Sequence, residues 1–170
     1  LAPVEQPATN NWVVAALYQF KEVSNAAELQ QRLLDLVNSI HLCGTLIVAS
    51  EGINGTVAGD RAAIDAVYQF LLSEGFNAME YKESFSSEKP FRKMKIKLKQ
   101  EIVTLGVEVK PRDLVGHYLD PKQWNELLAR DDVILVDTRN DYEYKAGPFK
   151  GAFDPKQGGF GNFPIYVKKN

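Results

Sequence analysis

Residues 88–100, EKPFRKMKIKLKQ, gather positive charge that could bind phosphate groups. From Lys93 to Lys99 every second residue is a lysine, and the residues between the lysines are apolar. In a β-strand this alternation places the lysines on one face and the apolar side chains toward the core. Such a basic face can neutralise RNA phosphates without reading the base sequence. The candidate RNA contacts are Lys89, Arg92, Lys93, Lys95, Lys97 and Lys99.

The alternative for this stretch is a solvated outer face, or an edge strand whose lysines discourage aggregation. Taken alone, the residues leave the two alternatives about even. The formal net charge of the chain is −2, so nucleic-acid binding has to come from a local patch. An acidic protein that concentrates its positive charge in one strand favours the binding face.

A second candidate for phosphate contact is the glycine-rich sequence SEGINGTVAG at residues 50–59. Residues 51–55 are expected to form a turn, because Gly52, Asn54 and Gly55 all tolerate positive φ. Free backbone N–H groups in such a turn can cradle a phosphate. The alternative is a tight hairpin, which is what glycine turns mostly form. The segment is not a Walker A motif, because no Gly-Lys-Ser or Gly-Lys-Thr follows.

Asp137 and Arg139 follow an apolar run, residues 133–136, which is expected to be a strand buried on both faces. Open α/β sheets bind ligands at the carboxyl ends of their strands, where these two side chains would lie. They could act directly in catalysis, or order a loop through a charge-assisted pair. The loop-ordering role is favoured. The sequence DYEY then begins a short helix that Gly147 and Pro148 end.

No residue of this chain is assigned a catalytic role. Cys43 is the single cysteine, and its apolar neighbours favour a structural thiol. A nucleophilic thiol needs an exposed site that lowers its pKa. His41 and His117 are too few and too far apart in sequence to indicate a metal site. No flavin, haem or metal motif appears, so the cofactor stays unassigned.

The composition is that of an ordinary globular protein, with 45% hydrophobic and 25% charged residues over 170 positions. No apolar run approaches the roughly 20 residues that span a bilayer, so no membrane partner is expected. Residues 1–10 lack the features of a signal peptide and are expected to be a flexible lead-in. The single cysteine weakly favours a reducing compartment, and the expected localisation is cytoplasmic. The oligomeric state is left open.

The elements expected over residues 11–100 follow the order β-α-β-β-α-β. Residues 12–20 have the Val and aromatic content of a strand. Further strands are expected at residues 45–49, 56–58, 79–85 and 91–98. Helices on one face of an antiparallel sheet predict an α+β, ferredoxin-like (acylphosphatase-like) fold.

Two helices of this domain have clear start signals. Ser24 or Asn25 can cap the first, and Asp60 can cap the second, which Gly75 ends. Gly44 is expected to end the region of the first helix. Apolar residues at helical spacing give each helix one buried face: Leu29, Leu33, Leu36, Val37 and Ile40 in the first, and Ile64, Val67, Phe70 and Leu71 in the second.

Residues 101–118 are expected to be an ordered connector, because they mix β-branched residues with glycine and proline. Residues 119–170 are expected to begin a second domain. Asp120 and Pro121 start a helix there, with proline in its first turn. Trp124, Leu127 and Leu128 would form its apolar face.

Four motifs in this order resemble a single family. They are EGINGT (51–56), PFRKMKIKLKQEIV (90–103), GHYLDPKQWNELL (116–128) and DTRNDYEYKAGPFKGA (137–152). Together they resemble the rhodanese-like tRNA uridine hydroxylases, which join an acylphosphatase-like N-terminal domain to an α/β rhodanese domain. The resemblance implies oxygen-dependent 5-hydroxylation of the wobble uridine in tRNA, with tRNA as the partner.

The essential cysteine of that family lies in a Cys-Thr-Gly-Gly-Ile-Arg-Cys loop, which this sequence lacks. Pro148 stands where family members usually have His. We therefore expect a piece of a longer protein: an intact first domain that docks tRNA, and the start of a rhodanese-like domain. Without the cysteine the chain alone should have no turnover. The alternatives are a rhodanese-type sulfurtransferase and a non-catalytic RNA-binding or interaction module.

Overall fold

The computed structural model describes residues 12–107, 116–156 and 158–169, so the expected lead-in and the middle of the expected connector lie outside the described residues. The chain divides into two compact units, unit 1 (Leu1–Val103) and unit 2 (Thr104–Asn170), which are described separately. Among the described residues, no helix has the length and hydropathy needed to cross a bilayer.

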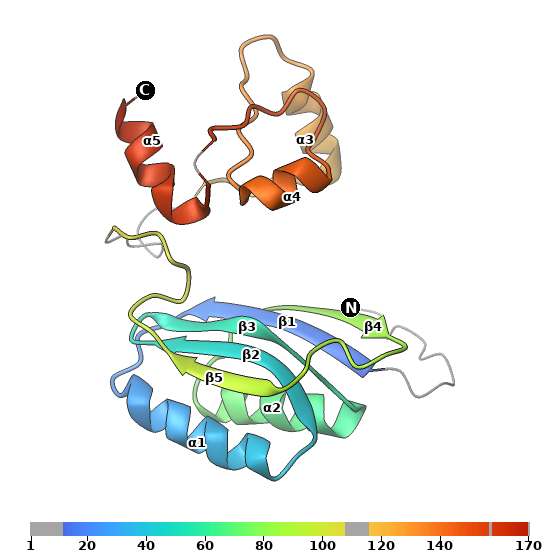
Figure 1. Cartoon of the computed structure of the whole chain (residues 1–170), viewed down its shortest axis with the longest axis vertical. Helices are drawn as coiled ribbons and strands as arrows, with labels where there is room; N and C mark the ends of the chain where they lie inside the picture. The colour runs from blue at the N-terminus through green and yellow to red at the C-terminus, as the bar shows by residue number, and fades with distance from the viewer. Residues whose placement is uncertain (1–11, 108–115, 157, 170) are drawn as a thin grey trace. The chain divides into compact units, whose positions relative to one another are not determined.

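Unit 1 is a five-stranded sheet with two helices on one face (Figure 1). Its strands are β1 (Trp12–Phe20), β2 (Leu42–Ala49), β3 (Gly52–Gly59), β4 (Glu80–Ser86) and β5 (Met94–Leu98). They lie in the order β4-β1-β3-β2-β5, antiparallel except for the β2–β5 pair, which is parallel. The first four strands and the two helices have the predicted β-α-β-β-α-β order. The α+β, ferredoxin-like prediction is therefore confirmed, and β5 extends the sheet by one strand.

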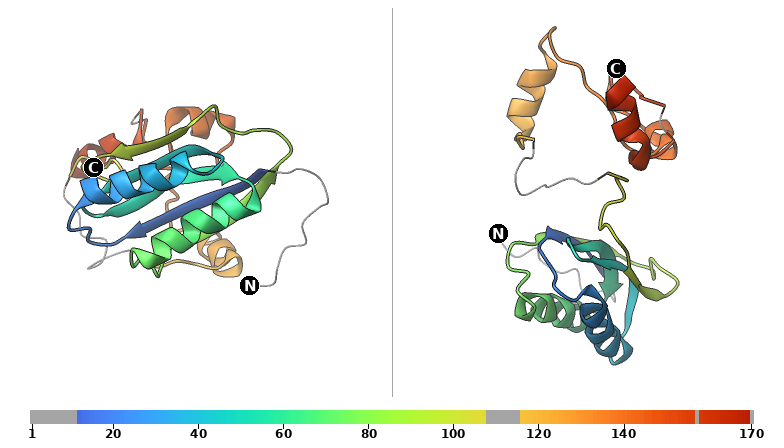
Figure 2. Two further views of the ribbon diagram at one scale, coloured as in Figure 1. Left: turned by 90° about the horizontal axis from the view of Figure 1, so that it is seen from below. Right: turned by 90° about the vertical axis from the view of Figure 1, so that its left-hand side faces the viewer.

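The two helices begin where their caps predict. In α1 (Ala26–Asn38) the Asn25 side chain accepts from the Glu28 N–H at 3.1 Å. In α2 (Arg61–Ser73) the Asp60 carboxylate accepts from the Ala63 N–H at 2.7 Å. Such caps satisfy N–H groups that the first helical turn leaves unpaired. Figure 2 shows the helices side by side beneath the sheet.

The core of unit 1 lies between this helix layer and the sheet. Val13, Ala15 and Leu17 of β1 point into it, and alternate residues of the strand do not. The helices contribute the predicted positions, with Leu33, Ile64 and Leu71 at or below 1% exposure. Burying one such side chain stabilises a fold by about 1.5–3 kcal/mol. Three of the predicted positions, Leu36, Ile40 and Phe70, are only partly buried, at the margin of the core.

The prediction that Gly44 ends the first helical region is wrong. β2 begins at Leu42, so Gly44 lies inside a strand. Its φ is +126°, and a Cβ there would lie 2.2 Å from the carbonyl oxygen of Thr56. Glycine is thus required by the close approach of β2 to β3, and it does not mark the end of a helix.

Unit 2 contains α3 (Pro121–Leu128), α4 (Asp141–Ala146), a 3₁₀ turn η1 (Phe160–Asn162) and α5 (Phe163–Lys169). The predicted starts of α3 and α4 are confirmed. Asp120 and Gln123 form a capping box at α3. The Trp124 ring of α3 packs against Phe149, with ring centroids 5.7 Å apart. The sequence patterns did not predict η1 or α5.

The predicted strand at residues 133–136 is wrong. The structure has one parallel bridge there, between Val136 and Phe153. Ile134 is 81% exposed, so the run is not buried on both faces. The reason is that the described part of unit 2 contributes no strand to either side of this segment, apart from the contact at Phe153.

Candidate functional site

The lysine-bearing strand β5 is an edge strand held in register by β2 and α1. Ile96 is buried, and its carbonyl oxygen accepts from the Gln30 Nε2 of α1 at 2.9 Å. Lys95 and Lys97 pair with Thr45 and Ile47, which lie on the face of the sheet opposite the helices. Both lysines are exposed. The predicted alternation of lysine and apolar residues is therefore present in the folded strand.

Lys93 and Lys99 continue this arrangement just beyond the two ends of β5. The Lys93 carbonyl oxygen accepts from the Gly44 N–H at 3.1 Å, and the Lys99 N–H donates to the Val48 carbonyl at 2.9 Å. These bonds extend the ladder by one residue at each end. The backbone at all four lysines is therefore fixed against β2.

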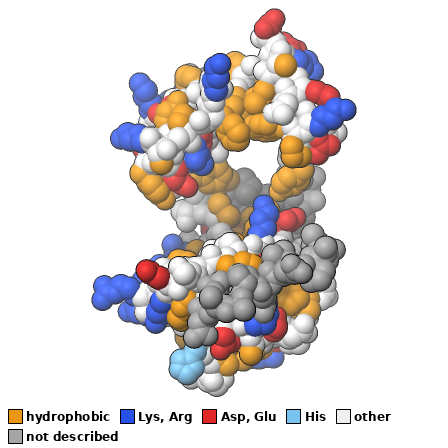
Figure 3. Space-filling view, turned by 90° about the vertical axis from the view of Figure 1, so that its right-hand side faces the viewer, with side chains coloured by type: hydrophobic (Ala, Val, Ile, Leu, Met, Phe, Trp, Pro, Cys, Tyr) orange, Lys and Arg blue, Asp and Glu red, His pale blue; other side chains and the backbone are white. Residues whose placement is uncertain are grey.

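Lys89 and Arg92 lie in the segment that leads from β4 to β5. The Lys89 Nζ lies 5.9 Å from the centroid of the Trp12 ring, a distance suited to a weak cation–π contact. All six predicted basic side chains are exposed. None of them forms an ion pair with any residue that the structure describes. Their charge is thus available to an anionic partner, and Figure 3 shows Lys and Arg side chains gathered along this edge of unit 1.

Leu98 departs from the pattern. The alternation predicts a core side chain, but Leu98 is 47% exposed at the last position of the strand. Ile96, with the partly buried Met94, therefore provides the apolar anchor of β5.

The prediction of a glycine turn at residues 51–55 is wrong. The turn is formed by Ser50 and Glu51, because Ala49 and Gly52 already pair across the β2–β3 hairpin. Gly52, Asn54 and Gly55 all lie in β3.

Strand β3 lies between β1 and β2, so its backbone is paired on both sides. Gly55, for example, is opposite Leu17 on one side and Leu46 on the other. A Cβ on Gly55 would lie 2.1 Å from the Thr45 carbonyl oxygen. These glycines serve close strand packing, and free N–H groups for a phosphate cradle are not available in a strand paired on both sides.

Cys43 lies inside β2, which begins at Leu42 and so is longer than the strand predicted at residues 45–49. It is completely buried, and its Sγ lies 3.5 Å from the Ala58 carbonyl oxygen. This is the environment of a structural thiol. Across residues 12–107, 116–156 and 158–169 there is no group of three or more His, Cys, Asp or Glu side chains that could hold a metal ion.

Asp137 and Arg139 form a two-point pair in unit 2. The Arg139 Nε donates to Asp137 Oδ1 at 2.9 Å, and its Nη2 donates to Oδ2 at 2.7 Å. The same Nη2 donates to the Gly147 carbonyl at 3.0 Å, just after α4. The hydrogen bonds from Arg139 hold the pKa of Asp137 below its ordinary value. The arrangement ties the loop after Val136 to the end of α4, which is what a loop-ordering role requires.

Three comparisons place this geometry among known proteins. A family model described as UPF0176 acylphosphatase-like domain matches residues 12–102. A protein of Acinetobacter baylyi called tRNA uridine(34) hydroxylase is 82% identical over 170 residues, which is 100% of this chain and 54% of the relative. A Deinococcus radiodurans protein of the same name is 56% identical, over 99% of this chain and 56% of the relative. The chain therefore spans about half the length of the curated relatives it matches.

Among solved structures, the chain is similar to one titled "BlsA ground state". The identity is 16%, over 53% of this chain and 66% of that chain, and the TM-score is 0.37. A likeness at this level carries no argument about function.

Proposed function

Because the chain belongs to the family of UPF0176 acylphosphatase-like domains, we propose that it is the N-terminal portion of an enzyme that hydroxylates uridine 34 of tRNA. Relatives named for that reaction share 82% and 56% of their aligned residues with this chain. In this proposal unit 1 docks tRNA, and unit 2 belongs to a rhodanese-like part that carries the reaction. The site of action is the cytoplasm.

The observation that carries the docking role is the geometry of β5. Lys95 and Lys97 share one face of the sheet, and the ladder to β2 fixes their backbone. Phosphate contacts made from a rigid strand position an RNA without reading its sequence. An enzyme that modifies one position shared by several tRNAs benefits from such sequence-independent docking.

The Asp137–Arg139 pair supports the proposal that unit 2 belongs to a rhodanese-like part. A charged pair just after the Val136–Phe153 bridge is suited to order a loop. Here the pair bridges that position to the end of α4 at Gly147. Its role is to position the loop, because both side chains use their charge on each other.

Rhodanese-type sulfur transfer is the alternative enzyme activity, and neither relative cited above is named for it. That reaction needs an accessible thiolate to carry the persulfide sulfur. The single cysteine, Cys43, is completely buried in β2. A purely non-catalytic RNA-binding module is the other alternative, and it shares the same docking surface.

The decisive experiment removes the gene that encodes this chain from its native host. Nucleosides from digested tRNA are then measured by mass spectrometry. We expect 5-hydroxyuridine and its derivatives at position 34 to disappear and to return with the wild-type gene. Unchanged modification in the deletion strain, with no second copy of the gene, would overturn the proposal. If modification is lost in the deletion strain but the purified chain does not bind tRNA, the hydroxylation proposal stands. The docking role of unit 1 is then contradicted.

A further inference from the structure

The sheet of unit 1 has a second face, opposite α1 and α2, which no described helix of unit 1 covers (Figure 2). We call it the open face. The strand registers assign to it the residues that alternate with the core positions. They include Trp12, Val14, Ala16 and Tyr18 of β1, Thr45 and Ile47 of β2, Asn54 and Thr56 of β3, Glu80 and Lys82 of β4, and Lys95 and Lys97 of β5.

One row of cross-strand neighbours runs over the whole width of the open face. Lys82 pairs with Ala16, Ala16 with Thr56, Thr56 with Thr45, and Thr45 with Lys95. The three inner side chains are small, and the lysines at both ends are exposed. With strands about 4.8 Å apart, the two lysine backbones lie about 19 Å from each other. The row is therefore a strip of small side chains with a positive charge at each end.

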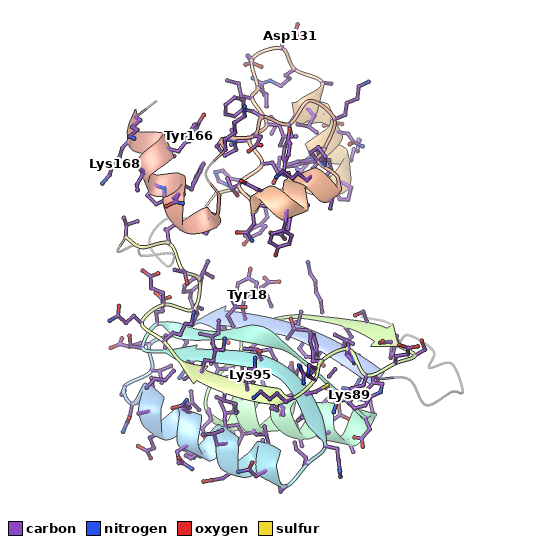
Figure 4. All side chains as sticks on the ribbon, in the orientation of Figure 1. Tyr18, Lys89, Lys95, Asp131, Tyr166 and Lys168 are labelled. Atoms are coloured by element: carbon purple, nitrogen blue, oxygen red, sulfur yellow. The ribbon has the colours of Figure 1, made fainter. Side chains whose placement is uncertain are left out.

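Two aromatic side chains lie on the open face of β1, one on either side of this row. Trp12 and Tyr18 are both half-buried, and about 20 Å of strand separates them. Lys89 lies over the Trp12 ring. In Figure 4, Tyr18 is on the side of the sheet away from the helices. β1 thus presents two aromatic side chains, and the lysines lie on the two edge strands of the sheet, β4 and β5.

This combination fits one kind of ligand. Unpaired bases stack on aromatic rings while their phosphates contact lysines, and such binding tolerates any sequence. Paired bases in an A-form duplex are already stacked inside the helix and cannot reach the rings. We propose that the open face binds single-stranded RNA, with bases on Trp12 and Tyr18 and phosphates on Lys82, Lys95 and Lys97. This proposal rests on the proposed function and specifies that unit 1 takes the unpaired part of its tRNA.

Two features limit the path of the RNA. The segment after β5 folds back onto the end of the β2–β3 hairpin, where Asn54 Nδ2 donates to the Ile102 carbonyl at 2.9 Å. The Ile102 N–H donates to Glu51 Oε1 at 2.7 Å, which closes that end. Glu80 pairs with Tyr18 and places one carboxylate on the β4 side. Asn54 lies between Tyr18 and Ile47 in its row, so the segment bound to it limits the approach from Tyr18 to Lys97.

The test uses the fluorescence of Trp12 in the full 170-residue chain. The chain has two tryptophans, and Trp124→Phe leaves Trp12 as the sole reporter. This change is mild, because the buried Trp124 Nε1 has no hydrogen-bond partner among the described residues. The probes are a single-stranded uridine octamer and a blunt RNA duplex of the same length. We expect saturable quenching by the single strand and at least tenfold weaker binding of the duplex.

The variants are made in this background. Tyr18→Leu should weaken octamer binding roughly 5- to 150-fold, which corresponds to the 1–3 kcal/mol of one stacked base. Lys82→Gln should weaken it several-fold and flatten its salt dependence. Tyr68→Leu is the matched control, since Tyr68 is also half-buried but lies on α2. It should change binding less than twofold, and circular dichroism verifies that each variant folds.

Several outcomes would overturn the proposal. Equal affinity for octamer and duplex would assign the contacts to phosphates alone. Unchanged octamer binding by Tyr18→Leu and Lys82→Gln, with tRNA still bound, would exclude the open face and leave the proposed docking through β5 intact. A chain that binds neither octamer nor tRNA would contradict both proposals. A concentration-dependent dimer that buries Trp12 would assign the face to a second copy.

Discussion

Arg61 of α2 forms an ion pair with Glu83 of β4. Its Nη1 donates to both carboxylate oxygens of Glu83, at 2.8 Å to Oε1 and 3.0 Å to Oε2. The same guanidinium contacts Asp65 one turn along α2, at 2.7 Å. The Tyr81 hydroxyl donates to Glu83, and the Tyr81 ring packs 4.9 Å from that of Tyr68. β4 is an edge strand, so this cluster attaches it to the helix layer.

The cluster predicts a pH-dependent stability. Burial alone would raise the pKa of Glu83, but hydrogen bonds from Tyr81 and Arg61 outweigh it and lower the pKa below the ordinary value. A lowered carboxylate pKa stabilises the fold above the unfolded-state pKa, about 4.3 for glutamate, and this is lost as pH falls through the folded-state value. Glu83→Gln should lower the free energy of unfolding by about 0.5–1 kcal/mol at neutral pH. In urea titrations that difference should shrink as the pH falls below about 4.3, and a difference that does not change with pH would contradict the assignment.

The lysines of β5 predict a salt-dependent affinity for tRNA. Lys93, Lys95, Lys97 and Lys99 changed together to Gln should weaken binding to all tRNAs tested. The slope of log K against log salt should fall by about 0.7–0.9 for each phosphate that the variant no longer neutralises. The fold should persist, because Ile96 remains buried. Arg139→Gln is the control and should bind as the wild type does, since Arg139 pairs with Asp137. If the four-Gln variant kept the affinity and the salt slope of the wild type, these four lysines would be a solvated strand edge with no binding role.

Gly55→Ala should severely destabilise unit 1. The new Cβ would lie 2.1 Å from the Thr45 carbonyl oxygen, a backbone atom that a paired strand cannot move. We expect a loss of about 3 kcal/mol or more, at the upper end for overpacked cores. Gly116→Ala is the matched control, because a Cβ there meets no atom within 4 Å. Urea unfolding of both variants decides the point, and equal midpoints would show that β2 and β3 can separate.

Cys43 should react with thiol reagents only when unit 1 unfolds. It is completely buried in β2, so a reagent has no route to the sulfur in the native state. With Ellman's reagent we expect one thiol per chain in strong guanidinium and almost none in native buffer. Rapid native labelling would show that the strand opens and that Cys43 is available for chemistry.

The two units should differ in their resistance to protease. Unit 1 should survive as a fragment that ends at or after Val103, because hydrogen bonds to Glu51 and Asn54 hold Ile102. Residues 104–170 expressed alone should bind a hydrophobic dye, since Ile134, Tyr142 and Phe149 are 81%, 71% and 60% exposed. A protected fragment from unit 2 and a digested unit 1 would reverse this expectation.

The sequence predicts the elements of unit 1 well where the signal is local. Asn25 and Asp60 cap their helices as expected, and the two helical apolar faces lie in the core. The period-2 alternation around Ile96 correctly indicates which side of β5 is buried. These features depend on neighbours a few residues away.

The errors arise where a distant strand decides the conformation. Glycine is typical of turns and helix ends, yet Gly44, Gly52 and Gly55 lie in strands. The reason is that only glycine allows β1, β2 and β3 to approach so closely at these positions. The run at residues 133–136 has the composition of a buried strand, but a strand needs neighbours that sequence composition cannot supply. The open face was not predicted for the same reason, because Lys82 and Lys95 become ends of one row only through four strand pairings.

The parallel pairing of β5 with β2 also joins two distant parts of the chain. Leu46 and Ile96 are neighbours in the sheet although about 50 residues separate them in the chain. The β2–β3 hairpin closes over two residues, whereas the β2–β5 ladder closes a long loop at a higher entropic cost. β5 follows the other four strands of the sheet in the chain, so it is the last of them to be synthesised. The lysines of β5 therefore take up their positions against β2 only after the rest of the sheet has been synthesised.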